Sequence, residues 1–176
     1  MSPPRIYSAM TIGLGLLSYA TAQLKTQPLP SINEAYITIA SGDCLNEFAS
    51  VVSPTNDRSN CVSVGVIEPG SFIYTRATTH SPVRWLAVSQ DADGNTRLSF
   101  NERGPGLSWR YTVKSSGEGY YGGLFIEADQ DYAVFGPDWQ VLSDGSVLAP
   151  DSDIDDPVQL ALVLPVEDET AAVSDL

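Results

Sequence analysis

Three aromatic side chains are the candidates for ligand binding in this sequence. Trp139 follows a Gly-Pro-Asp turn, and Tyr120 and Tyr121 are neighbours in a predicted strand, so their side chains point to opposite faces. At least one ring of that pair should therefore face solvent. A flat exposed ring can stack on the apolar face of a sugar or contact a partner protein. The alternative for Trp139 is packing in the core.

Acidic clusters are the candidates for metal binding. The densest cluster is Asp151, Asp153 and Asp155, where several carboxylate oxygens in one loop could hold a calcium ion. Runs of acidic residues are more often simply solvated, so we expect no bound metal or other cofactor. A second group has the spacing of a calcium loop but lacks glycine at the sixth position, and it should be a solvated hairpin tip: Asp91, Asp93, Asn95 and Glu102.

Residues suited to catalysis are sparse. The single histidine, His80, lies in a Thr-His-Ser-Pro loop, and no Gly-x-Ser-x-Gly motif accompanies it. Glycoside hydrolysis needs two carboxylates that meet in space, and the spacing of the acids gives no sign of such a pair. The acids that could supply one are Glu102, Glu118, Glu127 and Asp138. We therefore favour a protein that is not an enzyme, with a carboxylate-dependent glycoside hydrolase as the alternative.

The first 22 residues predict export. Arg5 supplies a positive charge, residues 6–17 form an apolar run broken by two glycines, and residues 20–22 (Ala-Thr-Ala) fit a cleavage site. The apolar run is shorter than the roughly 20 residues that a transmembrane helix needs. We expect a secreted, extracellular chain that begins at Gln23. Its acidic end lacks the apolar segment used for lipid attachment, so we expect no membrane anchor.

The two cysteines agree with export. Cys44 and Cys61 both follow the predicted cleavage site, and in an oxidising compartment we expect them to form a disulfide. Closing a loop of this length stabilises a fold by about 3 kcal/mol in the chain-entropy model. A zinc site needs about four ligands, and two cysteines with one histidine are too few.

Acidic residues dominate the charge of the chain. It has 22 Asp and Glu against 9 Lys and Arg, which gives a net charge of −13. Removing residues 1–22 takes away one Arg and no acid, so the charge of the mature chain falls to −14. Nucleic acid and anionic membrane surfaces would repel such a protein. The partners that remain are a polysaccharide or an extracellular protein.

Alternation of apolar and polar residues indicates β-strands from Ala35 onwards. The clearest case is residues 107–114, which predict one half-buried strand. Its expected inward side chains are Leu107, Trp109, Tyr111 and Val113. Asp93-Gly94 and Asp144-Gly145 predict tight hairpin turns. Further strands are expected at residues 62–66, 71–77, 83–90, 96–101, 120–127, 131–135, 139–142, 146–149 and 158–164.

About nine to ten short strands with tight turns predict an all-β fold, either an antiparallel sandwich or a barrel, because parallel pairing requires longer connections. Helix should be minor, limited to a turn within residues 45–52. After the signal peptide, residues 23–34 contain two prolines and predict an extended N-terminal segment. Residues 35–166 should form a single β domain, and residues 167–176 an acidic flexible tail.

These features resemble the small secreted β-rich domains of filamentous fungi, many of which have no established function. The resemblance is carried by the export segment, the cysteine pair, the acidic β-rich body and strand-turn phrases such as residues 139–145 (WQVLSDG). It covers roughly the mature chain and implies no catalytic or binding residues. We expect a secreted domain that acts by surface recognition, with glycan or cell-wall binding first. A structural or host-interaction role and the hydrolase are the alternatives.

Overall fold

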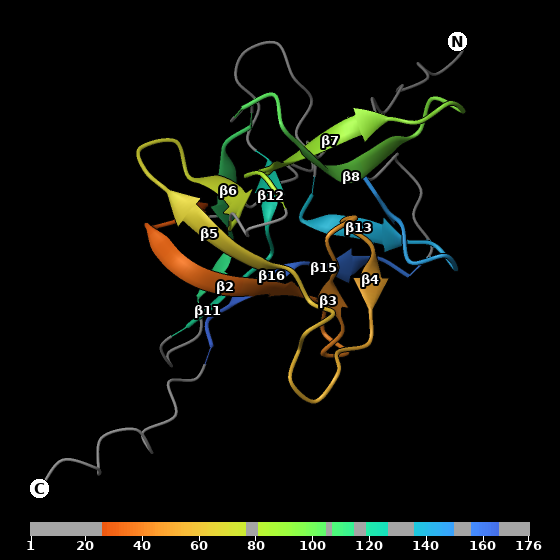
Figure 1. The fold of residues 1–176 in the computed structure, drawn as a ribbon. Helices are drawn as coiled ribbons and strands as arrows, with labels where there is room; N and C mark the ends of the chain where they lie inside the picture. The colour runs from red at the N-terminus through yellow and green to blue at the C-terminus, as the bar shows by residue number, and fades with distance from the viewer. Residues whose placement is uncertain are drawn as a thin grey trace, which may run out of the picture.

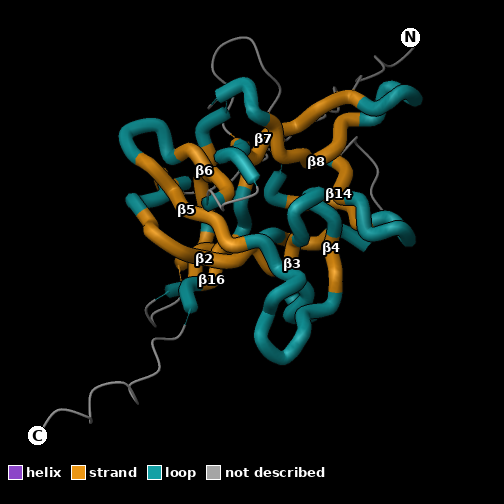
Figure 2. Tube along the Cα trace, in the orientation of Figure 1, coloured by secondary structure: helices purple, strands orange, loops and turns teal. Residues whose placement is uncertain are grey.

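The computed structural model describes residues 26–76, 81–104, 107–114, 119–126, 136–149 and 156–165. These residues form strands joined by turns and loops, with no helix among them (Figure 2). All the strand pairs are antiparallel, and the arrangement is sandwich-like rather than a closed barrel. The prediction of an antiparallel all-β fold is therefore confirmed.

Most strands belong to one long sheet (Figure 1). Its order is β10 (Val113–Lys114), β11 (Tyr120–Gly122), β16 (Ala161–Val163), β2 (Ile32–Thr38), β5 (Ser63–Ile67), β6 (Phe72–Thr75), β7 (Trp85–Gln90), β8 (Thr96–Asn101), β14 (Val147–Leu148), β13 (Asp138–Val141) and β15 (Val158–Gln159). β15 ends this path, yet only Leu160 separates it from β16 near the other end. The sheet therefore bends back around the core.

Two smaller groups of strands complete the fold. A three-stranded sheet has the order β1 (Gln27–Pro28), β9 (Trp109–Tyr111) and β12 (Phe125–Ile126). β3 (Cys44–Leu45) pairs with β2 and with β4 (Val51–Val52). The loop between β4 and β5 projects at the bottom of Figure 1.

The core is centred on two stacked tryptophans that join the two sheets. Trp109 of β9 and Trp139 of β13 are fully buried, with ring centroids 5.9 Å apart and an angle of 24° between the rings. The Nε1 atom of Trp109 donates a hydrogen bond to the carbonyl of Leu86 in β7 at 3.2 Å. An indole N–H normally needs such a partner when it is buried. The pair thus fixes the small sheet against the long one.

The strand predicted over residues 107–114 is broken in two. β9 lies in the small sheet and β10 at the edge of the long sheet, with Thr112 between them. Trp109 and Tyr111 are buried, as predicted, but Val113 is exposed. The inward prediction for Val113 is wrong because the chain changes sheets after Tyr111, so the alternation no longer refers to one core face. Similar breaks raise the strand count above the nine or ten expected.

Ordered β-structure begins before Ala35. β1 and the first residues of β2 precede it, and Leu29 and Ile32 lie in the core. Leu29 also accepts a hydrogen bond at its carbonyl from the buried Ser71 hydroxyl, at 2.8 Å. Pro28 therefore lies in an edge strand and Pro30 in the link between β1 and β2, which are positions that proline tolerates.

The helical turn expected within residues 45–52 is absent, and that prediction is wrong. β3 and β4 form a short hairpin there, and its tight turn includes Ala49 with a positive φ of 59°. The hairpin is attached to the β13–β14 turn by a hydrogen bond from the Val51 N–H to the carbonyl of Gly145, at 2.8 Å. Pairing across the loop outweighs the weak local preference for helix.

The two predicted Asp-Gly hairpin turns are confirmed, and a third hairpin lies earlier in the chain. Residues 68–70 join β5 to β6, Asp93-Gly94 lies between β7 and β8, and Asp144-Gly145 lies between β13 and β14. Gly94 and Gly145 both adopt the left-handed backbone conformation that such turns require. The signal peptide at 1–22, the strand expected at 131–135 and the acidic tail at 167–176 lie outside the described residues.

Candidate functional site

Trp139 is a core residue and not an exposed platform. Its side chain has 0% exposed surface, and its Nε1 atom donates to the carbonyl of Leu124 at 2.9 Å. Trp109 covers one face of its ring. A buried indole offers no face to a ligand, so the core alternative is correct and Trp139 is removed from the candidate site.

The tyrosine pair divides as the strand geometry predicts. Tyr121 is 8% exposed and packs edge-on against Tyr111, with their ring centroids 5.1 Å apart. Tyr120 is 39% exposed, and its ring lies over the backbone of Gly122 two residues along the strand. Tyr120 is therefore the one ring of the three candidates that solvent can reach.

The hairpin tip with calcium-like spacing is a hydrogen-bonded turn. Asp91 Oδ1 accepts from the backbone N–H of Asp93 and of Asn95, each at 2.9 Å, and Oδ2 accepts from Arg97 Nε at 2.5 Å. Desolvation raises the pKa of Asp91, but the hydrogen bonds from Arg97 and Asn95 outweigh it and lower that pKa to about 2. These carboxylate oxygens are thus occupied by the protein's own donors.

The remaining acidic candidates form no described metal or catalytic cluster. Among the described residues, no group of three or more His, Cys, Asp or Glu side chains could hold a metal ion. Glu102 and Asp138 are exposed, and Asp138 accepts a hydrogen bond from Gln159 at 3.3 Å. The candidates outside the described residues are Asp151, Asp153, Asp155, Glu118, Glu127 and His80.

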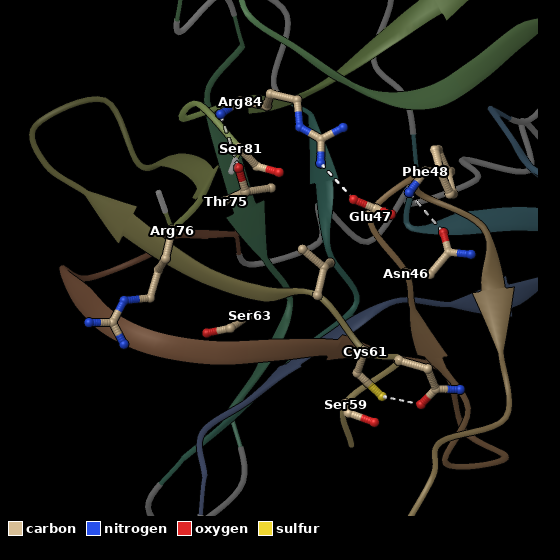
Figure 3. A pocket seen from close by; sticks show the side chains of 12 residues that line it. Asn46, Glu47, Phe48, Ser59, Cys61, Ser63, Thr75, Arg76, Ser81 and Arg84 are labelled. Atoms are coloured by element: carbon tan, nitrogen blue, oxygen red, sulfur yellow. Dashed lines mark hydrogen bonds and ion pairs between the residues drawn. The ribbon is translucent and has the colours of Figure 1, made fainter. Parts of the chain in front are cut away.

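A pocket of about 580 Å³ lies beside the disulfide. We call it the Arg84 pocket. It is formed by the β3–β4 turn, the segment entering β5, the end of β6 and the segment entering β7, which Figure 3 shows meeting around one hollow. Its lining residues are Asn46, Glu47, Phe48, Ser59, Asn60, Cys61, Val62, Ser63, Thr75, Arg76, Ser81 and Arg84.

The β3–β4 turn places Phe48 in solvent. Asn46 Oδ1 accepts hydrogen bonds from the backbone N–H groups of Phe48, at 2.9 Å, and Ser50, at 3.1 Å. This is the local turn that asparagine side chains favour. The turn holds Phe48 with 72% of its surface exposed, the most exposed of the large apolar side chains that the structure describes. An aromatic ring is therefore presented at the pocket by a hydrogen-bonded turn.

The disulfide anchors a second part of the pocket lining. Cys44 and Cys61 are joined, with their Cα atoms 5.6 Å apart, which confirms the predicted bridge. The loop before Cys61 is held by Asp57, which accepts hydrogen bonds from the Ser59 N–H at 3.1 Å and the Thr55 hydroxyl at 2.8 Å. The hydrogen bond from the Ser59 backbone, followed by that from the Thr55 hydroxyl, lowers the pKa of Asp57 to about 2. This wall of the pocket is therefore well defined.

Arg84 is the principal charged group of the pocket. Its guanidinium lies over the Phe100 ring, 5.9 Å from the centroid, and its backbone N–H donates to Thr75 Oγ1 at 3.0 Å. Its Nη2 is 3.7 Å from Glu47 Oε2, and Figure 3 shows these two side chains pointing towards each other. The Arg84 Nε atom is buried and has no hydrogen-bond partner among the described residues.

Arg76 is the second guanidinium in the lining. Its Nη1 forms an ion pair with Glu34 Oε2 at 2.8 Å, and Ser63 Oγ donates to the other oxygen of Glu34 at 3.2 Å. Glu34 thereby holds the side chain of Arg76 against β2 and β5. Figure 3 shows the Arg76 side chain directed away from Arg84, so its charge is balanced by Glu34 outside the lining.

Sequence reasoning missed the Arg84 pocket. Its residues come from segments near positions 46, 60, 76 and 84, and no motif connects them. One signal could have drawn attention to it, because the chain has only 9 Lys and Arg and two of them meet here. Phe48 lies in the segment that the sequence predicts as a helical turn, and nothing in its local pattern indicates an exposed ring.

The part of the chain that the structure describes contains no helix that is both long and apolar enough to cross a membrane. Comparison of the chain with models of protein families, with curated protein sequences and with solved structures found no match.

Proposed function

We propose that this protein is an extracellular, non-catalytic domain that recognises a saccharide in the Arg84 pocket. The observation that carries the proposal is the composition of the pocket, which combines one exposed aromatic ring with hydroxyl, amide and guanidinium groups. Sugars present alternating apolar faces and hydroxyl groups. An aromatic ring can stack on the apolar face of a sugar, and a few polar side chains can form hydrogen bonds with its hydroxyl groups.

Phe48 takes the role that the sequence analysis gave to Trp139. Its ring is already solvated in the free protein, so a ligand that covers it removes apolar surface from water. The polar lining comes from different segments, including Ser63 of β5, Thr75 of β6 and Ser81 before β7. Groups that converge from several strands can fix the orientation of a ligand more strictly than groups on one loop.

The pocket favours binding over glycoside hydrolysis. Among the described lining residues Glu47 is the one carboxylate, and it already faces Arg84. Hydrolysis by the usual mechanism needs a second carboxyl group roughly 5 to 9.5 Å away. The pocket is also too polar to suggest an apolar protein interface, since the core of such an interface is depleted of charged residues.

An extracellular location is part of the proposal. The disulfide at Cys44 and Cys61 supports it, because such bridges persist in oxidising compartments. The apolar run and small-residue site of residues 1–22 are the sequence basis for secretion. Intact-mass analysis of medium from expressing cells should find a chain that begins at Gln23.

A screen of immobilised glycans with the Phe48→Ala variant tests the proposal. We expect the wild-type protein to bind a defined group of saccharides and the variant to lose roughly tenfold or more in affinity, as stacked rings at hot spots often do. The thermal midpoint should stay within a few degrees, because removing an exposed side chain changes stability little.

The matched control is Ile67→Ala, which removes another exposed apolar side chain outside the pocket lining. It should leave saccharide binding unchanged. If the wild type bound no saccharide, or if both variants weakened binding equally, the proposed site would be wrong.

A further inference from the structure

The guanidinium of Arg84 is only partly used by the protein. Its Nε is buried without a partner among the described residues, and its nearest carboxylate oxygen is 3.7 Å from Nη2. Charge-assisted hydrogen bonds between nitrogen and oxygen are about 2.7 to 2.9 Å long, so this ion pair lacks a direct hydrogen bond. The guanidinium group therefore keeps hydrogen-bonding capacity that the described residues leave unused.

The geometry of an arginine specifies what that acceptor should be. The two Nη atoms of a guanidinium group form a planar fork that matches the two oxygens of a carboxylate. Packing over Phe100 keeps the plane of the Arg84 fork in place. The side chain is 21% exposed, so solvent and a ligand can still reach it from one side.

Glu47 is a carboxylate that a ligand can displace. Its side chain is 56% exposed and comes from the β3–β4 turn. An exposed ion pair of this kind contributes little, because water stabilises both charges when they separate. In the free protein, the Glu47 carboxylate therefore lies beside Arg84 where we expect the ligand carboxylate to bind. It can move into solvent when the ligand carboxylate forms a shorter contact with Arg84.

The charge balance of the pocket supports an acidic ligand. The lining holds two arginines in a chain with 22 acidic residues and only 9 Lys and Arg. The negative charge on the rest of the surface opposes an acidic ligand only weakly, because interactions over more than about 8 Å are largely screened at physiological ionic strength. A ligand carboxylate that replaces Glu47 beside Arg84 balances the charge of the guanidinium in its place.

We infer that the Arg84 pocket binds an acidic saccharide, with Arg84 pairing the carboxylate of a uronic acid unit and Glu47 as the internal group that this carboxylate displaces. The inference rests on the proposed saccharide recognition and specifies its ligand class. It assigns Arg84 to the acid group and Phe48 to the sugar ring.

Calorimetric titration with paired ligands tests the inference. Each uronic acid oligosaccharide of a panel is compared with its carboxyl-reduced neutral form and with a sulfated form of that neutral sugar. The wild-type protein should bind at least one acidic member roughly tenfold or more tightly than its neutral partner, as expected for a hydrogen-bonded charge pair. The sulfated form should bind less tightly than the carboxylate.

Two variants test the roles assigned to Glu47 and Arg84 in binding the ligand carboxylate. Glu47→Gln should tighten binding of the acidic form roughly two- to fivefold relative to the neutral form by removing the competing carboxylate. Arg84→Gln should reduce the affinity for the acidic form to that for the neutral form. Arg103→Gln, at an exposed arginine outside the pocket, is the matched control and should behave as the wild type.

Equal binding of acidic and neutral forms would overturn the inference and leave saccharide recognition intact. Preference for the sulfated form would overturn the assignment to a carboxylate. Failure of every sugar to bind would overturn the proposed function and the inference with it. If Arg84→Gln did not fold, weaker acidic binding by the exposed Glu47→Gln variant would still overturn the displacement step.

Discussion

At the scale of single residues, the main lesson concerns the aromatic side chains. Trp139 looked suitable for a ligand because it follows a turn, yet it is stacked on Trp109 at the junction of the two sheets. Phe48 lies in a segment without alternation and is the most exposed large apolar side chain described. Whether a ring lies in the core or in solvent depends on contacts between distant strands, and local sequence does not record those contacts.

Trp139→Ala should destabilise the protein severely, by about 3 to 5 kcal/mol, because it removes a large buried ring and leaves a cavity. The measurement is urea-induced unfolding followed by far-ultraviolet circular dichroism. Tyr120→Ala is the matched control, because it removes an exposed ring and should change the free energy of unfolding by about 0.5 kcal/mol or less. Similar losses in the two variants would contradict the described burial.

At the scale of elements, two hairpins are joined by charged side chains. Arg97 in β8 contacts Asp91 at the tip of the β7–β8 hairpin, and its Nη1 donates to Ser146 Oγ beside β14 at 3.0 Å. The arginine therefore connects the β7–β8 hairpin with the β13–β14 hairpin. Neither link follows from sequence pattern, although both turns do.

The Asp91 contacts predict a loss of stability in acid. The pKa of Asp91 is about 2 in the folded protein against an ordinary value of 3.8, so the folded state favours the ionised form. This contribution is fully present above pH 4 and is lost as the pH falls towards 2, because the unfolded chain takes up the proton first. Denaturant unfolding at a series of pH values should show this decline. Asp91→Asn should make the decline shallower, and an unchanged slope would contradict the assignment.

The disulfide is the second element-scale link, and it shapes the Arg84 pocket. Cys61 lines the pocket, and its partner Cys44 begins the β3–β4 hairpin that carries Phe48. Replacing both cysteines by serine should lower the free energy of unfolding by about 3 kcal/mol, since the bridge closes a 17-residue separation.

Saccharide affinity should fall with the disulfide even where the double variant remains folded. The check is titration at a temperature well below its thermal midpoint. Wild-type affinity in a folded double variant would show that the bridge does not organise the pocket.

At the scale of the whole molecule, the class of fold was predictable and the path of the sheets was not. Period-two alternation and Asp-Gly turns identified β7, β8 and the hairpins correctly because those features are local. The division at Thr112, which exposes Val113, and the burial of Leu29 depend on which strands meet across the molecule. Those pairings span long sequence separations and have no local signature.

The candidate site also has one part that the sequence predicts and one part that it does not. The disulfide could be predicted because only one pairing of two cysteines exists. The Arg84 pocket could not, because its residues come from four segments that meet only after the long sheet bends. A function based on a constellation of this kind becomes visible only in three dimensions.

The most direct test of the central claim is to follow backbone amide shifts of the isotope-labelled protein by NMR during titration with a saccharide that it binds. We expect saturable changes at Glu47, Phe48, Ser63, Thr75 and Arg84, with Tyr120 and its neighbours in β11 unaffected. Changes confined to the β10–β11 edge around Tyr120, with none at the Arg84 pocket, would contradict the claim.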